Sequence, residues 1–147
     1  MVELREITED NYGECFKLKV TEAQNNFVAS NIYSLAQARV FYETAYPFAV
    51  YADGGMVGFI MLGYLKPENQ YTVWRLMIDE RFQGKGYGRQ ALLLGIEYLK
   101  EKFGPPEIFL SYEPDNHVAE KLYESVGFKK TGGLWGDEII MRLNLKS

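Results

Sequence analysis

A glycine-rich segment in the second half of the chain has the residue types and the position of a phosphate-binding loop. It spans residues 83–89, between the apolar residues 76–78 and a long helical pattern that begins near Gly88. Glycine has no Cβ, so a ligand can approach its backbone amides closely, and the first amides of a following helix have no partner within that helix. These amides lie at the positive end of the helix dipole, where phosphate groups bind. Lys85 and Arg89 add positive charge, so we expect anion binding here.

The spacing of the glycines distinguishes between the known kinds of phosphate loop. A Walker loop requires Gly-Lys-Ser/Thr, but Gly86 follows the Gly84-Lys85 pair here, so no hydroxyl is present to hold magnesium. A dinucleotide fingerprint requires G-x-G-x-x-G, and Arg89 stands where its third glycine belongs. The pattern Gln/Arg-x-x-Gly-x-Gly/Ala does fit, with Gln83, Gly86 and Gly88 at its defined positions. It resembles the pyrophosphate loop of the GNAT family of N-acetyltransferases, which bind acetyl-CoA. The alternative is a helix start whose glycines only form a turn.

A second segment downstream resembles the other signature of the same family. Residues 116–128 fit N-x-x-A-x-x-L-Y-x-x-x-G-F, and they follow a strand-like run at residues 108–112. Two motifs in the right order are far more specific than either alone. The resemblance covers most of the chain and is strongest over residues 72–128. Within the family it is nearest to small bacterial polyamine (spermine/spermidine) acetyltransferases.

The resemblance implies an acetyl-CoA-dependent N-acetyltransferase, in which a small amine attacks the thioester directly in a ternary complex. The backbone of residues 83–89 would hold the pyrophosphate, and the backbone of Met77 and Ile78 would bond the pantetheine arm or polarise the thioester carbonyl. The residues implied to contact the cofactor are Met77, Ile78, Gln83, Gly84, Lys85, Gly86, Tyr87, Gly88, Arg89, Asn116 and Tyr123. As side chains, Lys85 and Arg89 are equally consistent with solvated surface cations.

Tyr123 is the predicted general acid. By the resemblance its phenol points at the thioester sulfur, and a phenol with a pKa near ~10 suits a departing thiolate with a pKa near ~8.5. The alternative is a helix tyrosine packed into the core, since the chain has 11 tyrosines. Asn116 fits the family asparagine that bonds the cofactor arm, and it also suits a helix cap.

Neither motif identifies the general base. An acceptor ammonium with a pKa near ~10.4 must lose a proton before it attacks. In the polyamine-acetylating branch, an acidic residue is expected about nine positions before the loop's Gln/Arg, but Trp74 stands there. Arg75 follows it and fits either a structural ion pair or a site for a substrate carboxylate. Other candidate bases are Glu22, Asp79, Glu80 and Glu113, each of which is also consistent with a solvated carboxylate.

The composition predicts a single domain over residues 1–147, with 47% hydrophobic and 24% charged residues. A net charge of −4 argues against nucleic acid or an anionic membrane surface as partner and suits a cationic substrate. No apolar run approaches the length of a membrane span. Cys15 is the only cysteine, so an intrachain disulfide is excluded and a cytoplasmic location is expected. One cysteine and one histidine give no case for a metal site.

The apolar periodicity predicts the element order β-α-α-β-β-β-α-β-α-β-β. Strands are expected at 2–8, 48–52, 56–65, 71–78, 108–112, 128–131 and 139–145, and helices at 12–19, 34–44, 88–103 and 116–126. Ser34 is the expected cap of the second helix, and residues 53–55 and 132–133 are expected turns. This order indicates an α/β (α+β) fold: a mixed, mostly antiparallel sheet with a central β-α-β crossover and helices on both faces. In the GNAT fold, the two parallel strands splay apart and the cofactor arm lies in the gap.

The acceptor amine is not fixed by these patterns. A polyamine is the first expectation, and an aminoglycoside, an amino acid, a protein N-terminus or a lysine follow it. The missing carboxylate at Trp74 favours an alternative, a non-catalytic acyl-CoA-binding or sensor module. A purely structural domain is the third hypothesis. We expect residues 21–46 to determine the acceptor, and the C-terminal hairpin with Trp135 is a candidate surface for a homodimer.

Overall fold

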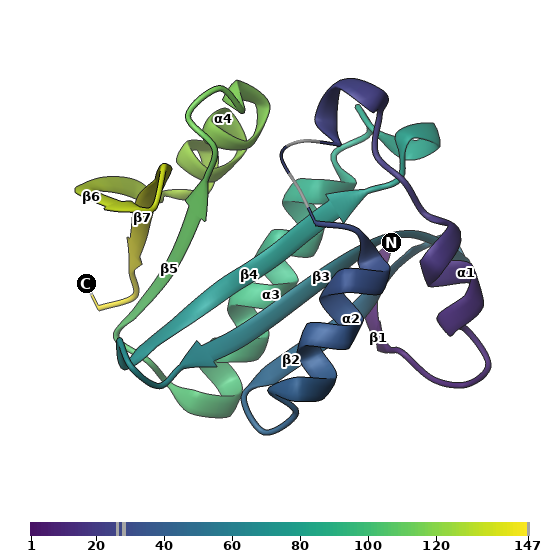
Figure 1. The fold of residues 1–147 in the computed structure, drawn as a ribbon, viewed down its shortest axis with the longest axis horizontal. Helices are drawn as coiled ribbons and strands as arrows, with labels where there is room; N and C mark the ends of the chain where they lie inside the picture. The colour runs from purple at the N-terminus through teal and green to yellow at the C-terminus, as the bar shows by residue number, and fades with distance from the viewer. Residues whose placement is uncertain (26, 28, 147) are drawn as a thin grey trace.

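A seven-stranded sheet with helices on both faces forms the framework of this protein, in a computed structural model that describes residues 1–25, 27 and 29–146 (Figure 1). The strands are β1 (Val2–Glu6), β2 (Ala45–Ala52), β3 (Gly55–Leu65), β4 (Gln70–Ile78), β5 (Glu107–Tyr112), β6 (Lys129–Trp135) and β7 (Glu138–Asn144). The helices are α1 (Tyr12–Lys17), α2 (Asn31–Val40), α3 (Tyr87–Phe103) and α4 (His117–Val126), with short 3-10 helices η1 (Glu22–Gln24) and η2 (Glu80–Phe82). The predicted order of helices and strands is confirmed.

The sheet is antiparallel at every junction except one. Its strand order is β1-β2-β3-β4-β5-β7-β6, and only β4 and β5 run parallel, because the long helix α3 connects them. Their register joins a single pair, Thr72 with Phe109, and beyond it the two strands diverge (Figure 1). The mixed sheet and the splayed parallel pair are therefore confirmed, and the gap lies at the carboxyl ends of both strands.

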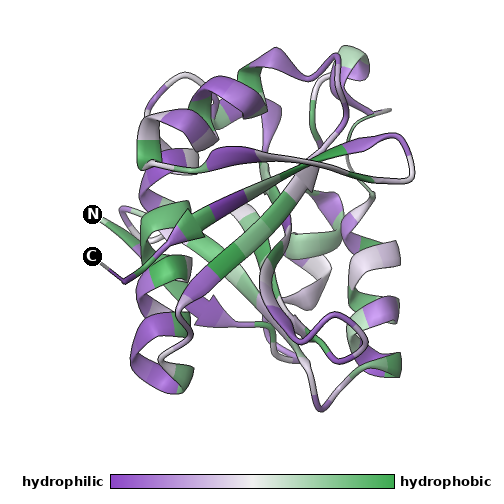
Figure 2. Cartoon of the chain, turned by 90° about the vertical axis from the view of Figure 1, so that its left-hand side faces the viewer, coloured by the Kyte–Doolittle hydropathy of each residue, from purple (hydrophilic) through white to green (hydrophobic). Residues whose placement is uncertain are grey.

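Two hydrophobic clusters hold the helices on the sheet. Helices α3 and α4 cover one face around a cluster that includes Ile60, Leu92 and Leu110. Helices α1 and α2 cover the other face, where Cys15 and Phe59 belong to a second cluster. Figure 2 shows the hydrophobic stretches concentrated on the central strands, whereas the helices carry hydrophilic residues as well. None of the helices described is both long and apolar enough to cross a membrane.

The start of α2 differs from the prediction. The helix begins at Asn31, because Ser30 supplies the cap: its Oγ accepts a hydrogen bond from the Tyr33 N–H at 3.1 Å. Ser34, the predicted cap, is instead buried inside the helix, and its hydroxyl has no hydrogen-bond partner in the described part of the chain. The polar stretch 21–31 before it contains η1, and its residues 26 and 28 lie outside the described residues.

The C-terminal hairpin also turns later than predicted. Gly132 has a φ of +88° but lies within β6, where the register with β7 shifts between Lys130 and Leu134. This glycine therefore forms an irregularity of the β-bulge kind, and the turn falls at Gly136, whose φ is +58°. The predicted turn at 53–55 is confirmed, with Gly54 at a φ of +86°. The late C-terminal turn extends β6 and places Glu138 at the first position of β7.

Gly58 in β3 packs against the end of β4 that borders the gap. A Cβ at this position would lie 2.4 Å from the Met77 carbonyl oxygen and 2.7 Å from Ile78 Cδ1. Since the carbonyl is backbone, β4 must shift to make room. We expect Gly58→Ala to lower the free energy of unfolding by about 2 kcal/mol in a denaturant titration. In the same strand, Gly55→Ala meets its nearest atom at 3.9 Å and serves as control, and equal losses in both variants would contradict the prediction.

Candidate active site

The gap between β4 and β5 opens into a cavity of about 790 Å³. Residues from β4, the following loop, the first turn of α3 and the start of α4 line it, together with residues of β5, β7 and the segment before α2. Its lining includes the predicted residues Met77, Ile78, Gln83, Gly84, Gly86, Tyr87, Gly88, Arg89, Asn116 and Tyr123. Lys85 alone among the predicted cofactor contacts is exposed and lies outside the lining. The two sequence motifs therefore meet around one cavity.

The backbone of the glycine loop offers a row of free donors. Gly84 and Gly86 have φ values of +80° and +82°, and Gly86 is the N-cap of α3. The first hydrogen bond of the helix runs from the Gln90 N–H to the Gly86 carbonyl at 3.2 Å. In the described part of the chain, no hydrogen bond uses the backbone N–H groups of residues 83–89. These amides at the positive end of a 17-residue helix form a cradle suited to a diphosphate.

The free edge of β4 continues the cradle. Because β4 pairs with β5 only at Thr72, its residues from Val73 to Ile78 have no paired residue in β5. Met77 and Ile78 lie on this edge and line the cavity. An extended ligand chain can pair with such an edge through its own amide groups. This geometry fits a pantetheine arm, whose amides alternate with short carbon chains.

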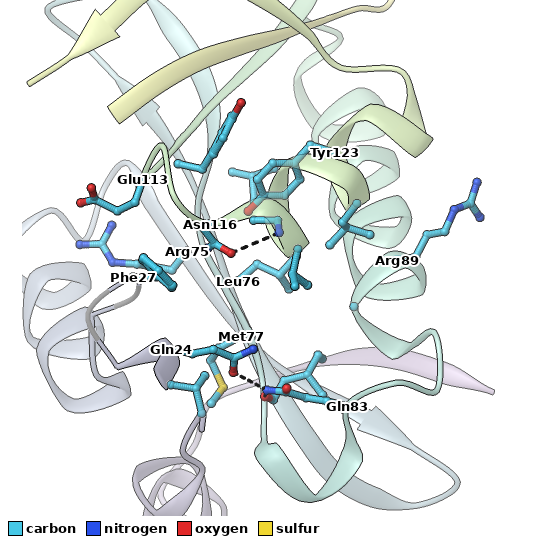
Figure 3. Close-up of a pocket in the computed structure, with 18 of the residues that line it drawn as sticks. Gln24, Phe27, Arg75, Leu76, Met77, Gln83, Arg89, Glu113, Asn116 and Tyr123 are labelled. Carbon is cyan, nitrogen blue, oxygen red and sulfur yellow. Dashed lines mark hydrogen bonds between the residues drawn. The ribbon is translucent and has the colours of Figure 1, made fainter. Parts of the chain in front are cut away.

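The side chain of Gln83 fixes the loop. Its Nε2 donates to the Ile78 carbonyl at 2.8 Å. The same nitrogen donates to Gln24 Oε1 at 2.9 Å (Figure 3). One amide therefore joins the loop to the end of β4 and to η1. The motif marks Gln83 as a contact of the cofactor, but the structure shows that its side chain holds the protein together around the loop.

Tyr123 projects from α4 into the cavity, beside Asn116 and across from Leu76 (Figure 3). The enclosure of its phenol raises the pKa of Tyr123 to about 12, and the negative charge of Glu138 adds to this shift. The phenol therefore keeps its proton at neutral pH. Asn116 caps α4, with its Oδ1 accepting the Ala119 N–H at 3.3 Å, and also lines the cavity.

A bulge in β4 brings Trp74 and Arg75 to the same face of the sheet. Arg75 pairs with Met61 and Val73 with Leu62, so Trp74 is the extra residue. The Trp74 ring lies 5.8 Å from the Phe41 ring at the end of α2. Arg75 donates to Gln37 of α2 at 3.1 Å and to the Trp74 carbonyl at 3.0 Å. Both side chains therefore face α2, on the side of the sheet opposite α3.

Arg75 has no carboxylate partner among the residues that the structure describes. Burial lowers the pKa of Arg75, and the nearby charge of Glu138 opposes that shift. Of the carboxylates in the described residues, none lies within ion-pair distance of the Arg75 guanidinium. In Figure 3 it lies with Glu113 and Phe27 at one side of the cavity, whereas Arg89 lies at the other side. Arg75 therefore forms no ion pair with any of the described residues, and its side chain lines the cavity.

Two of the candidate bases have carboxylates away from the cavity. Glu22 and Glu80 are exposed and do not line it, whereas Glu113 does. Glu138 of β7 also lines the cavity, although no motif marked it. No group of three or more His, Cys, Asp and Glu side chains in residues 1–25, 27 and 29–146 could hold a metal ion.

Asp79, another candidate base, is a structural residue. It is only 1% exposed, and it accepts hydrogen bonds from the Lys19 N–H at 2.9 Å, the Arg81 N–H at 3.0 Å and Arg81 Nε at 2.8 Å. Burial alone would raise the pKa of Asp79, but these hydrogen bonds outweigh it and the pKa is lowered. A carboxylate so held does not accept a substrate proton at neutral pH.

This arrangement predicts a pH-dependent effect of Asp79→Asn. We expect the variant to lose about 2 kcal/mol of unfolding free energy at pH 7, because buried donors lose a charged acceptor. The folded-state pKa lies below the ordinary value of 3.8, so the wild type loses this contribution as the pH falls below about 4. Urea titrations should therefore show a smaller difference in unfolding free energy between the wild type and Asp79→Asn at pH 3 than at pH 7. The same difference at both values would refute this role for Asp79.

Several residues that line the cavity carry no signal in either motif. They include Gln24, Phe27, Tyr33, Ser111 and Glu138. For Glu138 a weak signal exists in the alternation of the last strand. Ile139 and Leu143 are apolar and pack on the α3 side of the sheet, so Glu138 must face the other side. The segment before α2 has no such periodicity.

Comparison with known proteins supports the same family as the motifs. The sequence profile described as the acetyltransferase (GNAT) family matches residues 1–128. A spermine/spermidine N(1)-acetyltransferase from Bacillus subtilis (strain 168) is 33% identical over 141 residues, which cover 90% of this chain and 91% of that protein.

Solved structures agree at the level of the fold. Spermidine N-acetyltransferase from Vibrio cholerae, in complex with CoA and spermine, superposes with a TM-score of 0.75 at 18% identity, over 96% of this chain and 92% of that one. PaiA N-acetyltransferase from Thermoplasma acidophilum, in complex with coenzyme A, superposes with a TM-score of 0.70 at 22% identity. The superposition covers 98% of this chain and 99% of that one. The chain therefore belongs to the acetyltransferase (GNAT) family and is an acetyl-CoA-dependent N-acetyltransferase.

Proposed function

We propose that this enzyme transfers the acetyl group of acetyl-CoA to a primary amine of a small cationic molecule, with a polyamine as the first acceptor to test. The observation that carries the proposal is the single cavity that joins the free amides of residues 83–89, the phenol of Tyr123 and the carboxylates of Glu113 and Glu138. The name of the Bacillus subtilis relative, which refers to spermine and spermidine, supports the choice of acceptor.

The cofactor would lie along the loop and the free edge of β4. When bound, acetyl-CoA supplies an activated acetyl thioester. The amides of residues 83–89 receive its diphosphate, and Arg89 adds positive charge from the cavity wall. The backbone of Met77 and Ile78 pairs with the pantetheine arm and stabilises the charge that develops on the carbonyl oxygen. Lys85 lies outside the cavity and acts only through its charge.

Tyr123 acts as the general acid in this proposal. Its protonated phenol gives a proton to the sulfur that leaves as the amine attacks. Asn116 lies beside it and bonds the cofactor arm while it caps α4. The reaction is a direct transfer in a ternary complex, so the enzyme itself is never acetylated.

A thiol-release assay tests this proposal. Purified protein with acetyl-CoA is offered spermine, spermidine, aminoglycosides and amino acids, and we expect release of the CoA thiol with the polyamines. If the CoA thiol is released only with another class of amine, the proposed acceptor is wrong but the proposed acetyl transfer stands. Calorimetric binding of acetyl-CoA without thiol release for any amine, including lysine peptides and free N-termini, would instead support a non-catalytic acyl-CoA-binding module.

A further inference from the structure

The cleft continues beyond the cavity described above. A second cavity of about 420 Å³ adjoins it, and the two share Val73, Trp74, Arg75, Ser111 and Glu138 in their linings. The second cavity extends away from the glycine loop toward the turn between β6 and β7, where Trp135 contributes to its wall. An acceptor that reaches the first cavity therefore has space for the remainder of its chain in the second.

Glu138 lies at the junction with one oxygen free. Ser111 donates from its Oγ to Glu138 Oε1 at 2.8 Å, which anchors the carboxylate across β5 and β7. The described residues provide no hydrogen bond or ion pair to Oε2. The carboxylate is thus fixed in position and still able to bind a cation from either cavity. Arg75, Glu113, Tyr33 and Tyr123 face the first cavity with it.

The walls of the second cavity include both tryptophans of the chain. The bulge in β4 turns Trp74 toward the second cavity, and the late hairpin turn at Gly136 places Trp135 in the wall of the same cavity. Indole faces attract ammonium groups and also pack against methylene chains. Aromatic walls with an adjacent carboxylate therefore suit a chain that alternates ammonium groups with short alkyl segments.

We propose that Glu138 receives the reacting ammonium group of the acceptor, and that the second cavity between Trp74 and Trp135 holds the remaining cationic chain. This assignment rests on the function proposed above and defines the acceptor as a linear polyamine. It also accounts for the absence of a carboxylate at Trp74. Glu138 supplies that charge from β7, and the indole of Trp74 forms part of the wall of the second cavity.

The transfer removes two protons from the ammonium group of the acceptor. Glu138 takes one proton from the ammonium, directly or through a water molecule, and leaves a neutral amine. The amine forms the C–N bond to the carbonyl carbon, the C–S bond breaks, and Tyr123 gives its phenolic proton to the sulfur. The Tyr123 phenolate then recovers a proton from the acetylated nitrogen, and Glu138 releases the other proton to solvent.

Glu138→Gln tests the carboxylate through a pH profile. We expect kcat/KM for spermidine to fall by about 100-fold or more at pH 7, with the KM for acetyl-CoA unchanged. The deficit should shrink toward pH 10, because the acceptor is then increasingly neutral in solution. Asp137→Asn is the control, since this exposed neighbour makes the same charge change outside both cavities. Unchanged activity, or a loss of equal size at every pH, overturns the role of Glu138.

Trp135→Ala tests the second cavity by comparing acceptors of different length. We expect the KM for spermidine to rise by about 10-fold, and the KM for propylamine, which does not reach this cavity, to change by less than about two-fold. Trp135→Phe keeps an aromatic face and should recover most of the affinity. Calorimetry with acetyl-CoA verifies that each variant retains its cofactor site. Equal changes for both amines overturn the proposal.

The wild-type protein separates this inference from the proposed function. If it binds acetyl-CoA and acetylates no amine, the proposed function fails and this inference fails with it. If it acetylates polyamines while Glu138→Gln and Trp135→Ala behave as wild type, only the inference fails.

Discussion

Replacement of Tyr123 by phenylalanine is expected to lower kcat by about 100-fold or more, with little change in the KM for acetyl-CoA. The variant removes only the hydroxyl and keeps the ring, which packs between Tyr112 and Phe128. The centroid of the Tyr123 ring lies 6.1 Å from the centroid of each of these two rings. The leaving sulfur then loses the phenol that the proposed mechanism assigns as its proton donor. Steady-state measurement of thiol release with a saturating acceptor would show the loss in kcat.

Tyr112→Phe is the matched control for this prediction. Its phenol also has a pKa raised to about 12, by burial and by Glu120, but its hydroxyl donates to Glu120 Oε2 at 2.8 Å. We expect kcat to change by less than about three-fold, because the Tyr112 hydroxyl directs its proton to Glu120 and not to the substrate. Since the pKa of Tyr123 is about 12, ionisation of that phenol should not reduce the wild-type rate near pH 10. Equal losses in the two variants would assign Tyr123 a packing role.

The sequence revealed the parts of the site that require particular residue types at fixed spacing. The positive φ values of Gly84 and Gly86 require glycine, and the cap of α4 requires a residue such as Asn116. These requirements depend on residues that are close together in the sequence, so they can be recognised from the sequence alone. The order of strands and helices was also predictable, because long apolar runs and strong turn residues mark each element.

The individual side chains on the proposed acceptor side of the cavity could not be predicted beyond the segment 21–46, because their positions depend on registers between distant segments. The bulge at Trp74 changes which face of the sheet the neighbouring side chains take, and period-2 alternation along β4 contains no sign of it. Glu138 reaches the cavity only because β7 pairs with β5 and the hairpin turns at Gly136. Phe27 comes from a segment without periodicity. These residues are brought together by tertiary structure, and single-sequence patterns do not contain that information.

Substitution of Gly86 by valine is expected to weaken acetyl-CoA binding by on the order of 100-fold. Gly86 caps α3 at a φ of +82°, a conformation that a β-branched residue strongly disfavours. The loop must rearrange to relieve this strain, and the amides of residues 83–89 then lose their common direction. Loss of two hydrogen bonds to a charged diphosphate, at about 1.5 kcal/mol or more each, gives this magnitude. Isothermal titration calorimetry with acetyl-CoA would measure it.

Gly54→Val separates backbone strain from ligand binding. Gly54 has a φ of +86° in the hairpin between β2 and β3, and no atom lies within 4 Å of a Cβ built there. At Gly86 the nearest atom lies 3.9 Å away, so neither valine begins with a steric clash at its Cβ. Both variants should therefore lose about 1–2 kcal/mol of stability, but only Gly86→Val should lose affinity for acetyl-CoA. If Gly86→Val retained its affinity, the diphosphate would have to bind elsewhere than at these amides.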